Sequence, residues 1–257
     1  MLLKQTNGIS YFQFPNLAAF SGIWHGVFTR HGGFSPRPYR SLNVSLGVGD
    51  DRERVIKNRR LILSCSGGGT LVFANQQHGA KVLTLTAKNS TGIDPNGNRT
   101  PKGDALITNV RSKSLVIKVA DCQSVLLVDP ERRVIANVHS GWRGSLQNII
   151  ARTIQTMEVT FGCPPAHIHA GIGPSLGPCC GEFVNYKTEI PRAFWKYRSA
   201  ESVFDFWAIS RDQLEKAGVP KAQIHTDGRC TRCHTEQFFS YRGEGVTGRF
   251  ASVITLT

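Results

Sequence analysis

The sequence predicts a protein that combines β-strands with α-helices, and residues 115–154 show this most clearly. Three short apolar runs have the length and composition of buried strands: Leu115 to Val119, Ser124 to Val128 and Val134 to Val138. Asp129-Pro130 marks a turn between the second run and the third. Apolar residues then recur with helical spacing from Leu146 to Ile154, which predicts a helix that begins near Ser145.

The segment before this stretch adds further strands and one capped helix. A strand is expected from Gly26 into the glycine turn at Gly32-Gly33, and Asp50 or Asp51 can cap a helix that continues through Leu63. Further strand patterns follow: Leu71 to Ala74, Lys81 to Leu85 and Gly103 to Thr108. Residues 87–102 are polar and rich in Gly, Pro and Asn, which indicates a loop.

The last part of the chain has the same mixed character. Residues 171–181 are so dense in glycine and proline that a tight backbone path is expected there. Residues 182–194 show mixed helical spacing, and Asp205 can cap a helix that Gly218 ends. Residues 251–256 predict a final strand.

Composition describes an ordinary globular protein. The 257 residues are 40% hydrophobic and 19% charged, and no run approaches the ~18 apolar residues of a membrane span. The first residues lack the pattern of a cleaved signal, so a cytoplasmic protein is expected. Seven cysteines in a reducing compartment should be thiols or metal ligands rather than disulfides.

The net charge of +13 raises the question of a polyanionic partner. The basic residues are scattered, and no nucleic-acid-binding signature is present. A non-enzymatic nucleic-acid binder would also give no reason for the cysteine and histidines described next. A small phosphate-bearing substrate explains the charge as well, and no membrane partner is expected.

Three residues suggest a metal site. Cys122 and His139 lie at the ends of predicted strands, and His78 follows another strand. Two imidazoles and one thiolate suit zinc, and three protein ligands leave a fourth position for water or substrate. Arg143 and the helix beginning nearby would favour an anion at the same place. A buried core cysteine and a satisfied histidine explain the same residues, so both interpretations stay open at this point.

Other chemistries use some of the same side chains. Cys122 and His139 could be the nucleophile and base of a thiol hydrolase. Eight histidines with a single His-x-His pair, at His167 and His169, are too few for a trinuclear copper oxidase. The CxxCH pattern at 230–234 matches c-type haem attachment, but no export signal accompanies it. It could also be half of a zinc knuckle, although the adjacent Cys179 and Cys180 are badly spaced to complete one.

The chain resembles the bacterial laccase-domain family, whose members are also described as YfiH-like or multicopper polyphenol oxidase-like. The resemblance runs nearly end to end through ordered motifs: FTRHGGFS at 28–35, SLNVSLGVGDD at 41–51, KNRR at 57–60, QQHG at 76–79, GDALIT at 103–108, ADC at 120–122, VHSGWRG at 138–144, GIGPSLGPCC at 171–180, FFSYR at 238–242 and TGR at 247–249. It implies an α+β fold, a single domain over residues 1–257 with mixed β-sheets flanked by helices.

The resemblance also implies a function. It implies zinc, or copper if the family's name is taken literally, on His78, Cys122 and His139. It implies a purine nucleoside phosphorylase that converts adenosine, inosine, guanosine or methylthioadenosine with phosphate to a base and ribose 1-phosphate. Adenosine deaminase is expected as a side activity. The alternatives are a copper-dependent polyphenol oxidase and the thiol hydrolase.

Residue roles follow from the matching motifs. Cys122, His139 and Arg59 are expected to be catalytic, and Asn43, Arg59 and Arg143 to bind substrate, with the two arginines orienting phosphate. The CxxCH pattern is expected to be incidental, because only Cys230 and Thr231 match the family. The expected partners are purine nucleosides and phosphate, and the chain is expected to be a monomer or a homodimer.

Overall fold

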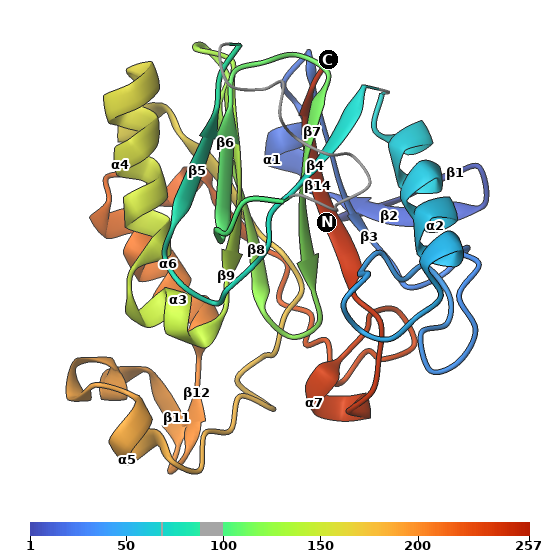
Figure 1. Ribbon diagram of the computed structural model, residues 1–257. Coiled ribbons are helices and arrows are strands. Elements are labelled where there is room, and N and C mark those ends of the chain that lie inside the picture. The colour runs from blue at the N-terminus through green and yellow to red at the C-terminus, as the bar shows by residue number, and fades with distance from the viewer. Residues whose placement is uncertain (68, 88–99) are drawn as a thin grey trace.

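The computed structural model describes residues 1–67, 69–87 and 100–257 and has four layers, with two mixed sheets stacked between helices (Figure 1). Helices α3, α4 and α6 cover the outer face of one sheet, and α2 covers the outer face of the other. The expected α+β class, with mixed sheets flanked by helices, is confirmed. Most of the loop predicted at 87–102 lies outside the described residues.

The first sheet has the strand order β1-β2-β3-β14-β7-β4. The pairing of β4 with β7 is parallel, and the other four strand pairs of this sheet are antiparallel. The bounds are Leu2–Thr6 for β1, Ile9–Gln13 for β2, Ile23–Phe28 for β3, Phe250–Leu256 for β14, Lys113–Val119 for β7 and Thr70–Phe73 for β4. The C-terminal strand β14 therefore lies in the middle of this sheet.

The second sheet has the order β13-β10-β8-β9-β6-β5, with parallel pairs at its two edges. The bounds are Ile224–Thr226 for β13, His169–Ile172 for β10, Gln123–Asp129 for β8, Val134–Ser140 for β9, Ala105–Thr108 for β6 and Val82–Leu85 for β5. A small sheet pairs β11, Arg198–Ala200, with β12, Val203–Phe204. The central strands expected from the apolar runs are confirmed.

The helices are mostly short. The α-helices are α1 at Pro15–Ala18, α2 at Arg52–Cys65, α3 at Trp142–Leu146, α4 at Ile149–Phe161, α5 at Tyr186–Glu189, α6 at Phe206–Lys216 and α7 at Tyr241–Glu244. Short 3-10 helices occupy Pro165–His167, Arg192–Tyr197 and Lys221–Gln223. Across the described part of the chain, no helix combines the length and apolar character needed to cross a bilayer. Asp51 and Asp205 cap α2 and α6 as predicted.

Strand alternation divides the buried side chains between three layers of core. In β7, Leu115 and Ile117 face the space between the two sheets, while Val116 faces α2. In β8, Leu126 packs between the sheets and Leu127 packs under α4. Because these strands are covered on both faces, they read as continuous apolar runs rather than as alternating ones.

The helix expected to begin near Ser145 is two helices. Asn148 separates α3 from α4 by adopting a left-handed conformation, φ 57° and ψ 50°. Its side chain then accepts a hydrogen bond from Ala151 N at 3.3 Å and caps α4. The prediction of one helix was wrong because apolar spacing continues across the break.

We expect the buried His25 to make folding stability fall in acid. Its Nε2 accepts from Phe14 N at 2.8 Å, and burial lowers its pKa from 6.5 to about 4. Between pH 6.5 and about 4, His25 is therefore protonated in the unfolded chain but neutral in the folded chain. The folding stability is complete above pH 6.5 and declines as pH falls toward 4. We expect His25→Gln to remove about 3 kcal/mol of this decline. Urea unfolding of both proteins at pH 8 and pH 4 measures it; parallel losses would contradict the prediction.

Candidate functional site

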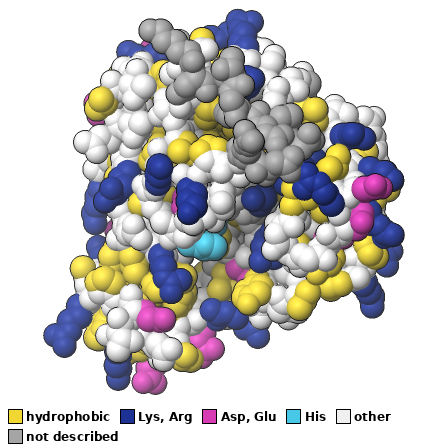
Figure 2. All heavy atoms as spheres, in the orientation of Figure 1, with side chains coloured by type: hydrophobic (Ala, Val, Ile, Leu, Met, Phe, Trp, Pro, Cys, Tyr) yellow, Lys and Arg dark blue, Asp and Glu magenta, His cyan; other side chains and the backbone are white. Residues whose placement is uncertain are grey.

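A cavity of about 770 Å³ opens where β7 and β9 end and β8 begins, and the predicted trio lies in it. Figure 2 shows a histidine side chain near the middle of this face, with Lys and Arg side chains around it. The volume falls within the range of ligand-binding pockets, about 300–1,000 Å³. Residues at these strand ends hold the functional side chains, and neighbouring loops and helices complete the walls.

His78, Cys122 and His139 converge in this cavity, as the sequence predicted. One ligand atom from each lies within 4.8 Å of the others. The two imidazole ring centroids are 4.9 Å apart, with their planes at 79°. His139 is buried near the end of β9, Cys122 lies in the tight turn between β7 and β8, and the exposed His78 lies in the loop after β4.

Asp104 holds the His139 side chain and the His78 backbone, and the sequence analysis did not assign it a role. Its Oδ1 accepts from His139 Nδ1 at 2.8 Å and from His78 N at 2.9 Å, while Oδ2 accepts from Gly79 N at 3.0 Å. The contact to Nδ1 leaves Nε2 of His139 free to be a ligand. Burial raises the pKa of Asp104, but His139 and the backbone donors lower it further, so the carboxylate stays ionised.

Cys122 and His139 stabilise each other's charged form. Burial alone would raise the pKa of the Cys122 thiol, but His139 and His78 offset this and hold it below its usual range. Burial alone would lower the pKa of His139, but Cys122 and Asp104 raise it. The thiolate is the form of cysteine that binds metals.

The donor set fits a zinc ion. One thiolate and two imidazoles, with a carboxylate behind one imidazole, are the ligands and the outer support expected of a zinc site with an open position. Gly141 keeps this space clear, because a Cβ there would lie 3.1 Å from His78 Cδ2 and 3.2 Å from Cys122 Sγ. A side chain at this position would require His78 or Cys122 to shift by a few tenths of an ångström.

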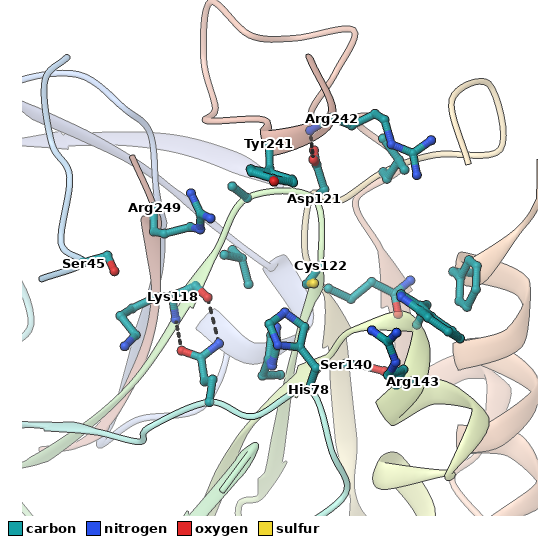
Figure 3. A pocket seen from close by; sticks show the side chains of 18 of the residues that line it. Ser45, His78, Lys118, Asp121, Cys122, Ser140, Arg143, Tyr241, Arg242 and Arg249 are labelled. Atoms are coloured by element: carbon teal, nitrogen blue, oxygen red, sulfur yellow. Dashed lines mark hydrogen bonds between the residues drawn. The ribbon is translucent and has the colours of Figure 1, made fainter. Parts of the chain in front are cut away.

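Four cations line the same cavity: Lys118, Arg143, Arg242 and Arg249. Figure 3 shows Arg143 on one side of Cys122, with Lys118 and Arg249 on the other. Burial lowers the pKa of Lys118 to about 8, and the positive charges of Arg59 and Arg249 lower it as well. A wall with this much positive charge favours an anionic ligand.

Aromatic side chains form another part of the lining: Trp142, Phe183, Phe206 and Tyr241. The Trp142 ring contacts Phe183, with centroids 5.8 Å apart, and the Arg143 guanidinium carbon lies 4.1 Å from the Trp142 ring centroid. Flat apolar faces beside cations suit a planar ring joined to a polar, charged group.

Two predicted substrate residues do not line this cavity. Asn43 is fully buried, and its Oδ1 accepts from Ser45 N at 3.0 Å and from Arg249 N at 2.9 Å. Arg59 is 6% exposed, and its Nε donates to Val44 O at 3.0 Å. Asn43 therefore positions two residues that do line the cavity, Ser45 and Arg249, while Arg59 packs over the Phe73 ring and lowers the pKa of Lys118 by its charge.

Asp121 joins the cavity to the C-terminal loop, and the sequence analysis also left it without a role. Its carboxylate accepts from Thr231 Oγ1 and Ser240 Oγ, each at 2.7 Å, and from Arg242 N at 2.6 Å. Its φ of 85° is uncommon for a residue with a side chain. Both Asp121 and Cys122 line the cavity, and the hydrogen bonds of Asp121 tie this turn to the loop that carries Thr231, Ser240 and Arg242.

These features define a class, namely an α+β protein whose pocket holds a Cys-His-His group able to bind a metal ion and is lined by cations and aromatic rings. The family described as multi-copper polyphenol oxidoreductase laccase matches residues 24–257, so the chain belongs to this family. Lys118 and Asp121 precede Cys122 closely and Arg249 ends the TGR motif, so these motifs could have signalled the residues that the sequence analysis left unassigned.

Several named proteins and solved structures align with almost the whole chain. Purine nucleoside phosphorylase YlmD of Geobacillus stearothermophilus is 32% identical over 91% of this chain and 90% of its own. A purine nucleoside phosphorylase of Deinococcus radiodurans is 35% identical over 97% and 94%. The crystal structure of YlmD from Geobacillus stearothermophilus matches with a TM-score of 0.87 at 30% identity, over 99% of this chain and 98% of that one. The crystal structure of the Bacillus licheniformis hypothetical protein YfiH also gives 0.87, at 28% identity over 99% of both chains.

Proposed function

We propose that this protein is a zinc-dependent purine nucleoside phosphorylase. One observation carries the proposal: the His78, Cys122 and His139 trio and the cationic wall share a single cavity large enough for a nucleoside and phosphate. The names of the similar proteins support the same activity. Adenosine, inosine, guanosine and methylthioadenosine are the proposed substrates, because the aromatic lining can stack any purine.

The reaction joins a phosphate oxygen to C1′ of the ribose and breaks the bond from C1′ to N9 of the purine. Arg143, Lys118 and Arg249 hold the phosphate by charge-assisted hydrogen bonds and aim it at C1′. Trp142 and Tyr241 hold the base and exclude water from its faces. When bound by the trio, zinc would supply a Lewis acid that stabilises negative charge.

Arg59 has a different place in this proposal from the one the sequence suggested. The positive charge of Arg59 contributes to the low pKa of the Lys118 amine. We propose that Arg59 is a positioning residue and that Lys118 is the side chain that contacts phosphate. Asn43 is likewise proposed to position Arg249 through its backbone.

Adenosine deamination is the proposed side activity. It would use the same trio, because three protein ligands leave one coordination position for water. Inosine formed from adenosine without phosphate would reveal it. A chelator separates both zinc activities from the thiol-hydrolase alternative, in which Cys122 and His139 act alone. Oxidation of phenols that requires added copper would instead favour the polyphenol oxidase.

Inosine turnover tests the function directly. We expect hypoxanthine and ribose 1-phosphate to form only when phosphate is present. The phosphate KM should rise as pH increases through about 8, because Lys118 loses its charge there. Lys118→Met should raise this KM roughly 10-fold at pH 7, the loss of one charge-assisted hydrogen bond. Lys118→Arg keeps its charge and should flatten the profile; equal profiles in all three proteins would remove Lys118 from the phosphate site.

A further inference from the structure

Four cysteines outside the cavity converge on one point. A sulfur from each of Cys179, Cys180, Cys230 and Cys233 lies within 4.8 Å of the other three. Cys233 Sγ is 3.6 Å from Cys179 Sγ and 3.6 Å from Cys180 Sγ. All four are free thiols. The adjacent Cys179 and Cys180 were expected to be badly spaced to complete the CxxC pair, but the structure brings all four sulfurs together.

The topology explains why sequence spacing did not reveal this cluster. Strands β10 and β13 are parallel neighbours, so the loops that follow them leave the sheet at the same edge. Ser175 N donates to Arg229 O at 3.3 Å, and Thr231 N donates to Ser175 O at 3.0 Å. These bonds hold the two loops side by side, so that each supplies two cysteines.

The backbone around the cluster brings the two loops close together. A Cβ at Gly177 would lie 3.1 Å from Cys230 Cβ and 2.6 Å from a ring carbon of Trp207, so the close approach of the loops needs glycine there. Cys180 N donates to Gly177 O at 2.9 Å and closes a turn that brings both adjacent cysteines to Cys233.

We propose that Cys179, Cys180, Cys230 and Cys233 bind a structural zinc ion, separate from the trio in the cavity. Four thiolates around zinc at about 2.3 Å form a tetrahedron whose edges are about 3.8 Å, close to the two sulfur separations of 3.6 Å. A complete set of four protein ligands leaves no position for water, which is the mark of a structural site.

The spacing also separates zinc from other uses of four cysteines. An iron–sulfur cluster places several atoms between its cysteines, and sulfurs all within 4.8 Å leave room for one ion only. A disulfide would bring one pair of sulfurs to about 2.05 Å and leave the other two thiols unused. Cys233 instead lies at the same distance from two partners.

The ion would stabilise one wall of the cavity. Thr231, between the cysteines of the CxxC pair, donates to Asp121 Oδ1, and Asp121 also accepts from Arg242 N in the cavity wall. Zinc would therefore tie the loop after β10 to the segment that carries Tyr241 and Arg242. This inference does not depend on the proposed phosphorylase activity.

Zinc content and X-ray absorption test the site without interference from the trio. The background for the test is His78→Ala/Cys122→Ala, purified with zinc in anaerobic buffer. We expect one zinc per chain in this background, with an absorption spectrum that fits four sulfur neighbours at about 2.3 Å. Adding Cys179→Ser and Cys233→Ser should abolish the zinc, whereas adding Cys65→Ala, at a buried cysteine outside the cluster, should retain it.

Several results would overturn the proposal. These are a background protein without zinc, a shell that contains nitrogen or oxygen, iron with acid-labile sulfide, or a disulfide among the four found by alkylation and mass spectrometry. If the Cys179→Ser/Cys233→Ser protein fails to fold, the single variant Cys179→Ser, at an exposed position, replaces it. That variant should yield its zinc to a chelator at least tenfold more readily than the background, and equal retention would contradict the site.

Discussion

Replacing Cys122 by alanine is expected to remove the metal from the cavity and to lower phosphorolysis by about 1,000-fold or more. The change deletes the only thiolate of the trio and leaves two imidazoles, of which His78 is exposed to solvent. A Lewis acid contributes several kcal/mol to stabilising the transition state, and about 1.4 kcal/mol corresponds to each tenfold change in rate. Metal content and inosine turnover, measured on the same preparation, check both parts of the prediction.

The matched control is Cys163→Ala, at a buried cysteine under α4 that contacts neither cluster. It should keep the metal content and turnover of the natural protein while losing some stability. Metal content should fall by one ion per chain in Cys122→Ala, with the second cysteine cluster still loaded. Full turnover by Cys122→Ala would exclude the trio as the active site. Turnover that a chelator leaves intact, but that Cys122→Ala abolishes, would favour the thiol hydrolase.

The sequence predicted those parts of the structure that depend on local pattern. Strands buried on both faces appear as apolar runs, and Asp51 and Asp205 cap helices within one turn of themselves. The pattern failed at Asn148, because the signal for a helix break is a backbone conformation that asparagine tolerates rather than requires. Side-chain type offered the trio as one of two open interpretations, and the family motifs around His78, Cys122 and His139 favoured it.

Long-range contacts set the limit of prediction for the site. Asp104 is one carboxylate before an ordinary strand, and nothing nearby in sequence indicates that it meets His139 on β9. Arg59 and Lys118 are both basic residues near the site, but only the path of the chain decides which one lines the cavity. The four-cysteine cluster depends on a parallel pairing of two strands that are distant in sequence.

Asp104→Asn is expected to weaken metal binding by about 10- to 100-fold, although Asp104 is not itself in the trio. Every hydrogen-bond partner of the carboxylate is a donor: the His139 ring and the backbone N–H groups of Gln77, His78 and Gly79. An amide has the same shape but turns its NH₂ group toward some of these donors. His139 then loses the partner that holds Nε2 toward the cavity, and the His78 loop loses part of its anchor.

We also expect Asp104→Asn to lower the free energy of unfolding by about 3 kcal/mol, because a buried charged network loses its acceptor. Asp129→Asn is the matched control, since Asp129 is an equally buried carboxylate that accepts from Glu131 N and Arg132 N, both at 3.0 Å, at the far end of β8. Both variants should lose stability in urea, but only Asp104→Asn should lose metal in a chelator titration. Equal metal affinity in the two would show that Asp104 serves the fold alone, and that the trio holds its geometry without it.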